Sequence, residues 1–102
     1  MEKTVTRKYK IELPVDVAES ISNNEIINLL IDKALTKAEY YLSKSKNMEE
    51  RYGISFSDYQ KKVEESNKEN FKEWDDLILW EGYVLGFKEW NRKYEELRFC
   101  RK

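Results

Sequence analysis

The side chains with the clearest chemical potential in this chain are four carboxylates that lie close together: Glu73, Asp75, Asp76 and Glu81. Carboxylates can ligate Mg²⁺ or act as general acids and bases. On a helix, however, Asp75 and Asp76 point about 100° apart, so they cannot ligate one metal ion without help from another element. We therefore interpret the group as an acidic edge that faces solvent or a partner, and we expect no metal site.

The rest of the composition offers little else for catalysis. The chain of 102 residues contains no histidine, which removes the commonest general base and the commonest zinc ligand. Its single cysteine, Cys100, has no second cysteine in the chain with which to form a disulfide, and its role stays open. We predict a protein that is not an enzyme and binds no cofactor.

Composition favours a folded protein of a reducing compartment. The chain is 38% charged and 40% hydrophobic, with a net charge of −1, too apolar for disorder and too balanced for a surface built entirely for nucleic acid. Its length predicts one domain over residues 1–102. The longest apolar run, Leu77 to Trp80, is far shorter than the roughly 20 residues that cross a bilayer, and no secretory signal is visible. We expect a cytoplasmic protein without membrane contact.

Four helical or extended elements must position these residues, and the first is a predicted β-strand over residues 4–13. Apolar and polar residues alternate there, which is typical of a strand with one buried face. Pro14 ends it, because proline cannot donate to a ladder. No second strand of comparable strength follows, so we expect pairing with a second copy in a homodimer. The apolar side consists of Val5, Tyr9, Ile11 and Leu13.

The polar side of this strand suggests one function. Thr6, Lys8 and Lys10 lie on it, and a two-stranded ribbon with such a face resembles the one that some dimeric repressors place in the DNA major groove. A strand face that is simply solvated is the alternative.

Next comes a long helix predicted over residues 24–52, with Asn23 or Asn24 as its N-cap and Gly53 at its C-cap. It would be about 43 Å long, so we expect either a break near 43–47 or packing against another subunit. A heptad seam runs along it at alternating spacings of three and four residues: Ile27, Ile31, Ala34, Ala38, Tyr41, Ser45, Met48 and Tyr52.

Two further helices complete the predicted mainly α fold. A short one over 55–66 begins at Ser55, and a long aromatic one over 70–98 contains all three tryptophans of the chain. The aromatic helix has two apolar stripes that together cover more than half its circumference, so it should be packed on more than one side. The first stripe contains Leu77, Trp80, Val84, Phe87 and Tyr94, and the second contains Phe71, Trp74, Ile78 and Leu85.

A pair of glycines interrupts the aromatic helix. Gly82 and Gly86 are four residues apart and together cost roughly 2 kcal/mol relative to alanine. They could admit another helix at short range, or they could meet the equally spaced Ala34 and Ala38 within the chain. The residues expected in packing, within the chain or across a dimer, are Ile27, Ile31, Ala34, Ala38, Gly82 and Gly86.

Two segments resemble small prokaryotic, largely archaeal, antitoxin-like proteins. RYGISFSDY at 51–59 is similar to their Tyr-Gly-x-Ser motif, and WDDLILWEGY at 74–83 to their Trp-acid-acid-x-Ile-x-Trp motif. The resemblance covers residues 51–90 and carries no catalytic residue. It implies a partner of a small toxin.

We therefore predict a non-enzymatic interaction module of antitoxin type, a homodimer whose aromatic helix neutralises a small basic toxin. Acidic residues would face the basic partner and tryptophans would anchor it. A DNA-binding regulator that uses the strand, or an obligate homodimer without another role, stays an alternative. The predicted partner-binding residues are Trp74, Asp75, Asp76, Glu81, Trp90 and Tyr94.

Overall fold

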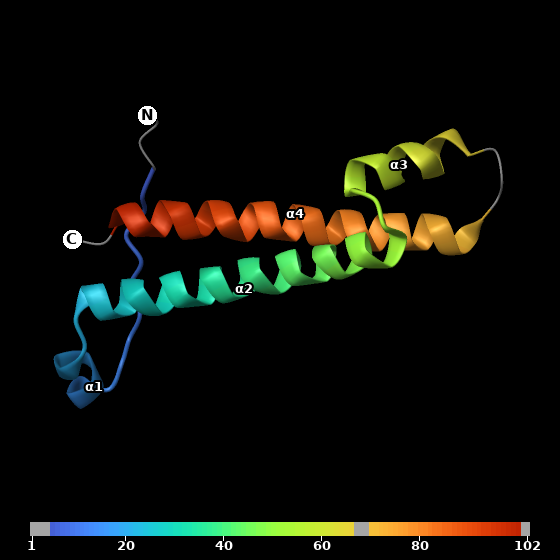
Figure 1. The fold of residues 1–102 in the computed structure, drawn as a ribbon. Helices are drawn as coiled ribbons and strands as arrows, with labels where there is room; N and C mark the ends of the chain where they lie inside the picture. The colour runs from blue at the N-terminus through green and yellow to red at the C-terminus, as the bar shows by residue number, and fades with distance from the viewer. Residues whose placement is uncertain (1–4, 67–69, 101–102) are drawn as a thin grey trace.

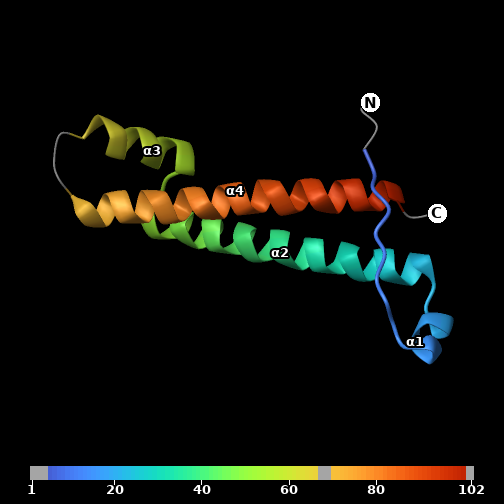
Figure 2. The same cartoon turned by 180° about the vertical axis from the view of Figure 1, so that it is seen from behind.

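The computed structural model describes residues 5–66 and 70–100, and the fold in these ranges is a long helical hairpin. Helices α2 (Asn23–Tyr52) and α4 (Phe71–Cys100) lie side by side and antiparallel, as Figure 1 and Figure 2 show from opposite sides. The short α1 (Val15–Ser20) precedes α2 at one end, and α3 (Phe56–Glu65) lies against α4 at the other. The molecule is elongated, with extents of 62 × 32 × 21 Å.

Helix α2 begins one residue earlier than predicted because Ser22 is its N-cap. The Ser22 Oγ accepts a hydrogen bond from the Glu25 backbone N–H at 3.1 Å, and the Glu25 carboxylate accepts one from the Ser22 N–H at 3.3 Å. This reciprocal pair is a capping box. The prediction of Asn23 or Asn24 as the cap was wrong, since both lie inside the helix.

The C-terminus of α2 is where the sequence predicted it, and the helix is unbroken. Gly53 has a φ of 68°, the left-handed conformation that favours glycine, and its N–H donates to the Glu49 carbonyl at 2.7 Å. The predicted break near 43–47 is absent. Because α4 has the same length and lies alongside, α2 has a neighbour over most of its length without a second subunit.

Polar side chains also fix where α3 and α4 begin. The Ser55 Oγ accepts from the Asp58 N–H at 3.2 Å, and the Asn70 side-chain oxygen accepts from the Glu73 N–H at 3.2 Å. Each bond satisfies a backbone donor that has no partner inside the helix. The predicted helices over 55–66 and 70–98 are therefore confirmed, with ends shifted by one or two residues.

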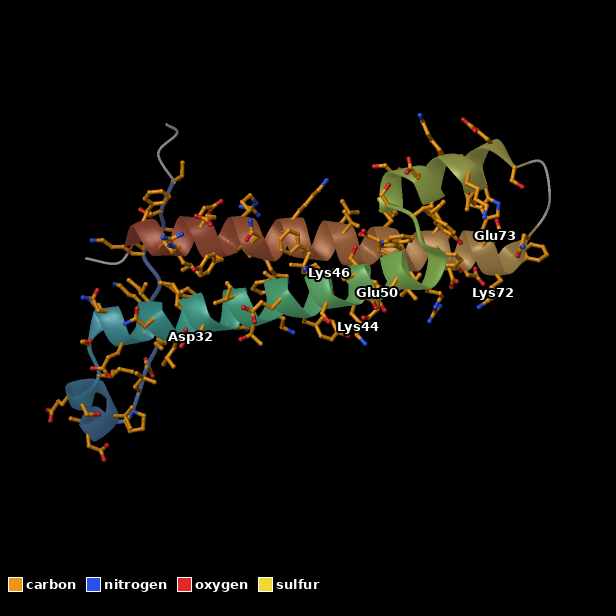
Figure 3. All side chains as sticks on the ribbon, viewed as in Figure 1. Asp32, Lys44, Lys46, Glu50, Lys72 and Glu73 are labelled. Atoms are coloured by element: carbon orange, nitrogen blue, oxygen red, sulfur yellow. The ribbon has the colours of Figure 1, made fainter. Side chains whose placement is uncertain are left out.

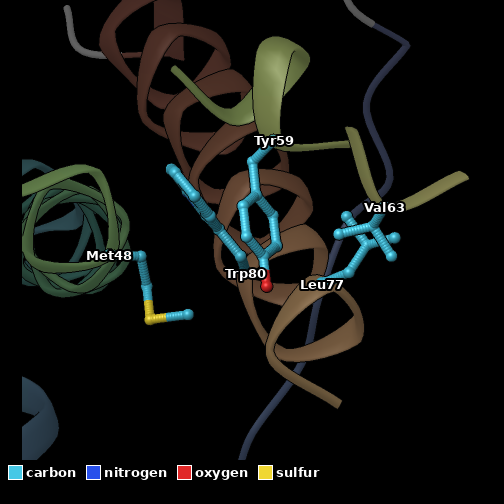
Figure 4. Packing of buried hydrophobic residues seen from close by; sticks show 5 residues of the cluster. All are labelled: Met48, Tyr59, Val63, Leu77 and Trp80. Atoms are coloured by element: carbon cyan, nitrogen blue, oxygen red, sulfur yellow. The ribbon is translucent and has the colours of Figure 1, made fainter. Parts of the chain in front are cut away.

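The core lies where α3 covers the hairpin (Figure 4). Trp80 is fully buried, and its ring centroid lies 5.3 Å from that of Tyr59. The Trp80 Nε1–H donates to the Ser45 Oγ at 2.9 Å, and the Tyr59 hydroxyl donates to the Glu73 carbonyl at 3.0 Å. Buried aromatic residues thus keep their polar atoms paired. The cluster consists of Met48, Tyr59, Val63, Leu77 and Trp80.

The structure does not support the N-terminal strand. Residue 4 lies outside the described ranges, and residues 5–14 form neither strand nor helix; no strand is present in 5–66 or 70–100. Val5 and Tyr9 on the predicted apolar side are 96% and 85% exposed. A strand needs a hydrogen-bonded neighbour, and a single chain of this fold supplies none. Pairing across a homodimer stays a prediction.

Candidate functional site on the outer face of α4

The candidate site is a row of four apolar side chains on α4, here called the outer stripe: Phe71, Trp74, Ile78 and Leu85. Their spacings of three, four and seven residues place them on one side of the helix. Their exposed fractions are 77%, 39%, 68% and 56%. Adjacent exposed apolar side chains of this size are typical of an interaction surface.

The outer stripe lies next to the side of α4 that forms the core and is not part of it. Leu77 and Trp80 are buried and Val84 packs against the same cluster. The sequence pattern contained this second stripe and predicted that it would be packed, but Phe71, Ile78 and Leu85 were not among the predicted binding residues. The spacing of the apolar residues could have identified them. It gives α4 two apolar faces, whereas a hairpin of two helices covers only one face of each helix.

Gly82 makes a gap in the outer stripe. It lies four residues after Ile78 and three before Leu85, and it is exposed. A Cβ atom added there would meet nothing within 4 Å. Nothing in the described part of this chain therefore requires a glycine at this position, although a glycine inside a helix costs about 1 kcal/mol relative to alanine.

Gly86 has a different environment. A Cβ atom on it would lie 2.9 Å from ring carbons of Tyr41 on α2, so this glycine allows the two helices to approach. The prediction that both glycines meet Ala34 and Ala38 was wrong because of the register. Tyr41 lies opposite Gly86, and the two helices are antiparallel. Ala34 and Ala38, which precede Tyr41, therefore face turns of α4 that follow Gly86.

The residues predicted for helix packing otherwise lie between the two long helices. Ile31, Ala34 and Ala38 are buried, and Ile27 is half-buried. Every residue of the predicted heptad seam is at least half-buried. The buried part of this seam therefore serves packing within the chain, and a dimer contact along the seam stays a prediction.

Two of the predicted carboxylates flank the outer stripe. Asp75 and Glu81 are exposed, and no ion pair joins either of them to another residue in the described ranges. Asp75 directly follows Trp74, and Glu81 lies three residues after Ile78. The stripe therefore has an acidic margin that is free to meet a cation.

Asp76 differs from its neighbours, since it is buried and already bonded within the chain. The Tyr52 hydroxyl donates to the Asp76 Oδ2, and Arg51 and Lys72 place cations 3.7 and 3.9 Å from the same oxygen. Burial, followed by the hydrogen bond to Asp76, raises the pKa of the Tyr52 hydroxyl. Asp76 thus joins α2 to α4 and is not exposed to a partner.

The Glu73 side chain is also bonded within the chain. Its side chain accepts a hydrogen bond from the Asn70 amide at 3.0 Å. Figure 3 shows Glu73 and Lys72 at the α3 end of α4, far along the hairpin from Asp32. Among residues 5–66 and 70–100, no three histidine, cysteine, aspartate or glutamate side chains lie close enough together to hold a metal ion.

The remaining predicted partner-binding residues, Trp90 and Tyr94, lie towards the C-terminal end of α4 and are half-buried. Lys93 lies 4.3 Å from the centre of the Trp90 ring, and Arg98 lies 5.6 Å from the centre of the Tyr94 ring. They do not extend the outer stripe. The six predicted residues therefore divide into three at the stripe, one in the core and two near the opposite end.

The residues predicted to contact DNA are exposed but lie on irregular backbone. Thr6, Lys8 and Lys10 belong to the segment 5–14 that is neither strand nor helix. A ribbon in the major groove needs paired strands, which the single chain does not contain in its described part. DNA binding stays a prediction.

Comparisons with protein-family models, curated proteins and solved structures found no match to this chain. None of the helices in the described residues is both long and apolar enough to span a membrane.

Proposed function

We propose that this protein is a non-enzymatic binding module that docks a partner on the outer face of α4. The observation that supports this most is the outer stripe itself, because Phe71, Ile78 and Leu85 are more than half exposed along one continuous helix. Apolar side chains in this arrangement bind a partner helix with the same spacing. Trp74 supplies the aromatic anchor that is typical of the centre of an interface.

The margin of the stripe favours a basic partner. Asp75 and Glu81 carry two negative charges without ion pairs to other described residues. A second copy of this chain on the same face would double these charges along one seam, whereas a partner with lysines or arginines beside an apolar row would neutralise them. We therefore favour a different, basic protein over a homodimer through this face.

An antitoxin-type role is the specific form of this proposal. The motifs at 51–59 and 74–83 resemble those of antitoxin-like proteins, and the second motif contains Trp74, Asp75, Ile78 and Glu81 of the site. A toxin that handles RNA carries a basic surface, and an acidic apolar face could cover it.

Substitution of the stripe tests the binding role. The variant Ile78→Glu places a charge in the centre of the stripe, and Leu29→Glu is the matched control, because Leu29 on α2 is 62% exposed against 68% for Ile78. Tagged wild type, I78E and L29E would be purified from the native cell, and any small basic protein in equal amount would be purified and titrated against each. We expect I78E to lose at least about tenfold in affinity, and L29E to keep it.

Charge reversal tests the partner's chemistry. The double variant Asp75→Lys/Glu81→Lys should slow association with a basic partner and reduce its salt dependence. Recovery of the wild type alone, as a monomer in sedimentation, would contradict the proposal. A wild-type dimer that I78E converts to a monomer would show instead that a second copy covers the stripe.

A further inference from the structure

A second apolar surface lies at the opposite end of the hairpin, in a groove between the N-terminal segment and the two long helices. Its apolar lining includes Leu30 from α2 and Trp90 and Leu97 from α4. The groove has a volume of about 450 Å³, which is within the roughly 300–1,000 Å³ of small-molecule sites. The groove is open to solvent along one side, and it is large enough to admit a small ligand.

The charges around this groove are of the opposite sign to those beside the outer stripe. Three cationic side chains line it, namely Arg7, Lys33 and Lys93. Lys93 is paired with Glu89 at 3.1 Å, whereas no ion pair joins Arg7 or Lys33 to any residue in the described ranges. The groove thus combines an apolar lining with two cations that have no ion-pair partner in the described part of the chain.

The carboxylate in the groove does not change this balance. Glu96 is the acidic residue of the lining, and it accepts from Arg92 at 2.6 Å. Its charge is therefore already compensated by a residue outside the groove. An anion in the groove would meet Arg7 and Lys33 without competing for them with a carboxylate of residues 5–66 or 70–100.

We propose that this groove binds a small amphipathic anion, with a single apolar chain against Trp90 and Leu97 and a carboxylate head at Arg7 and Lys33. Burial of methylene groups would supply most of the affinity. Charge-assisted hydrogen bonds would orient the head and discriminate against a neutral analogue. This site is separate from the outer stripe and does not depend on the function proposed for that stripe.

Decanoate is a suitable probe, and Cys100 provides a local readout. Cys100 lines the groove and is the chain's single cysteine, so its alkylation by the neutral reagent iodoacetamide reports on this site alone. Calorimetric titration of the full chain should show saturable decanoate binding, at least about tenfold tighter than binding of decanol, because the head group contributes charged hydrogen bonds. Bound decanoate should slow the alkylation of Cys100.

Matched variants locate the head group. Arg7→Glu/Lys33→Glu should weaken decanoate binding by about tenfold or more. The control Lys8→Glu/Lys37→Glu makes the same change in net charge on the same two segments with residues that do not line the groove, and it should bind as the wild type does. All four residues are exposed, so circular dichroism should show unchanged helix content.

Four outcomes would overturn the proposal. Decanoate that neither saturates nor protects Cys100 in the wild type would do so without any variant. Equal affinity in the two double variants would remove the role of Arg7 and Lys33. Loss of decanoate binding in I78E would place the ligand on the outer stripe. If the protein binds anionic vesicles but does not bind free decanoate, the groove is a membrane contact and not a site for a small anion.

Discussion

The two ends of the hairpin bury aromatic residues to different extents, although both ends are built from α2 and α4. At the covered end, where α3 lies on α4, Trp80 is fully buried and Tyr59 packs against it. At the open end, formed by the N-terminal half of α2 and the C-terminal half of α4, Trp90 is only half-buried beneath Lys93. The difference shows what a third helix contributes to a small fold.

Two helices alone can bury only the narrow strip where they touch. The residues of α2 buried most completely at the open end are correspondingly small: Ala34 and Ala38 are exposed by 1% and 2%, while the larger Ile31 keeps 8% of its surface exposed. A wide side chain such as Trp80 needs atoms on more than one side, and α3 provides them through Tyr59 and Val63. We therefore expect stability to be concentrated at the covered end and binding at the surfaces that α3 does not reach.

The largest expected effect is the loss of the central tryptophan at the covered end. Trp80→Ala removes a fully buried ring and should lower the free energy of unfolding by about 3–5 kcal/mol. Trp90→Ala, the same change at the open end, should cost only about 1–2 kcal/mol because the Trp90 ring is not fully buried. Urea denaturation of both variants measures the difference. Equal losses would contradict the contrast between the two ends.

The next largest effect concerns the polar link between Tyr52 and Asp76 at the covered end. Tyr52→Phe removes a hydrogen bond to a buried carboxylate and should cost about 1.5–3 kcal/mol near neutral pH. The fold raises the pKa of Tyr52 above its ordinary value of 10.0, so it favours the neutral hydroxyl. The stability that Tyr52 contributes is therefore complete below pH 10 and is lost as the pH rises above it.

Denaturation at a series of alkaline pH values checks this sign. The wild type should lose stability more steeply above pH 10 than Tyr52→Phe does. Tyr40→Phe is the control, because Tyr40 is 52% exposed and forms no hydrogen bond to a carboxylate in the described structure. A Tyr52→Phe variant with the wild-type slope would show that the link does not couple ionisation to folding.

The two glycines of α4 test how closely the helices approach between the two ends. Gly86→Ala would place a Cβ atom 2.9 Å from the Tyr41 ring, and we expect a net loss of about 1–2 kcal/mol from the strain. Gly82→Ala meets nothing and should gain up to about 1 kcal/mol of helix stability. Thermal unfolding distinguishes them, and the same sign for both would mean that Gly86 is not a contact point.

The smallest expected effect is at the caps. Ser22→Ala removes the capping box at the open end and should cost about 0.5–1 kcal/mol, mostly as local fraying of the first turn of α2. Ser55→Ala removes an equivalent bond at the start of α3 and should cost more, about 1–2 kcal/mol, because α3 covers the core. Amide hydrogen exchange reports both. If Ser22→Ala reduced the exchange protection of amides near Trp80 more than Ser55→Ala does, the larger effect expected for the α3 cap would be contradicted.

Local signals in the sequence determined the helices and their inner faces. The spacing of the α2 seam predicted which side meets a neighbour. Gly53 marked the end of α2, and Ser55 the start of α3. Such features depend on residues within one or two turns of each other, so they are visible without the fold.

The candidate site was only partly visible for the same reason. The sequence identified Trp74, Asp75 and Glu81 as partner-facing, and the structure places all three at an exposed stripe. It grouped Asp76 with them because it could not show that Tyr52, 24 residues earlier, would bond to that carboxylate. The alternation of residues 5–13 predicted a strand, but a strand exists only with a neighbour whose position no local pattern contains.

The sequence by itself thus determined that the chain is mainly helical, where its long helices end and which faces are apolar. Only the tertiary structure decided which apolar face is covered. Gly86 meets Tyr41 while Gly82 meets nothing, and Trp80 is buried while Ile78 is 68% exposed. The physical reason is that helix formation follows from neighbours along the chain, whereas burial depends on the register and number of helices that meet in space.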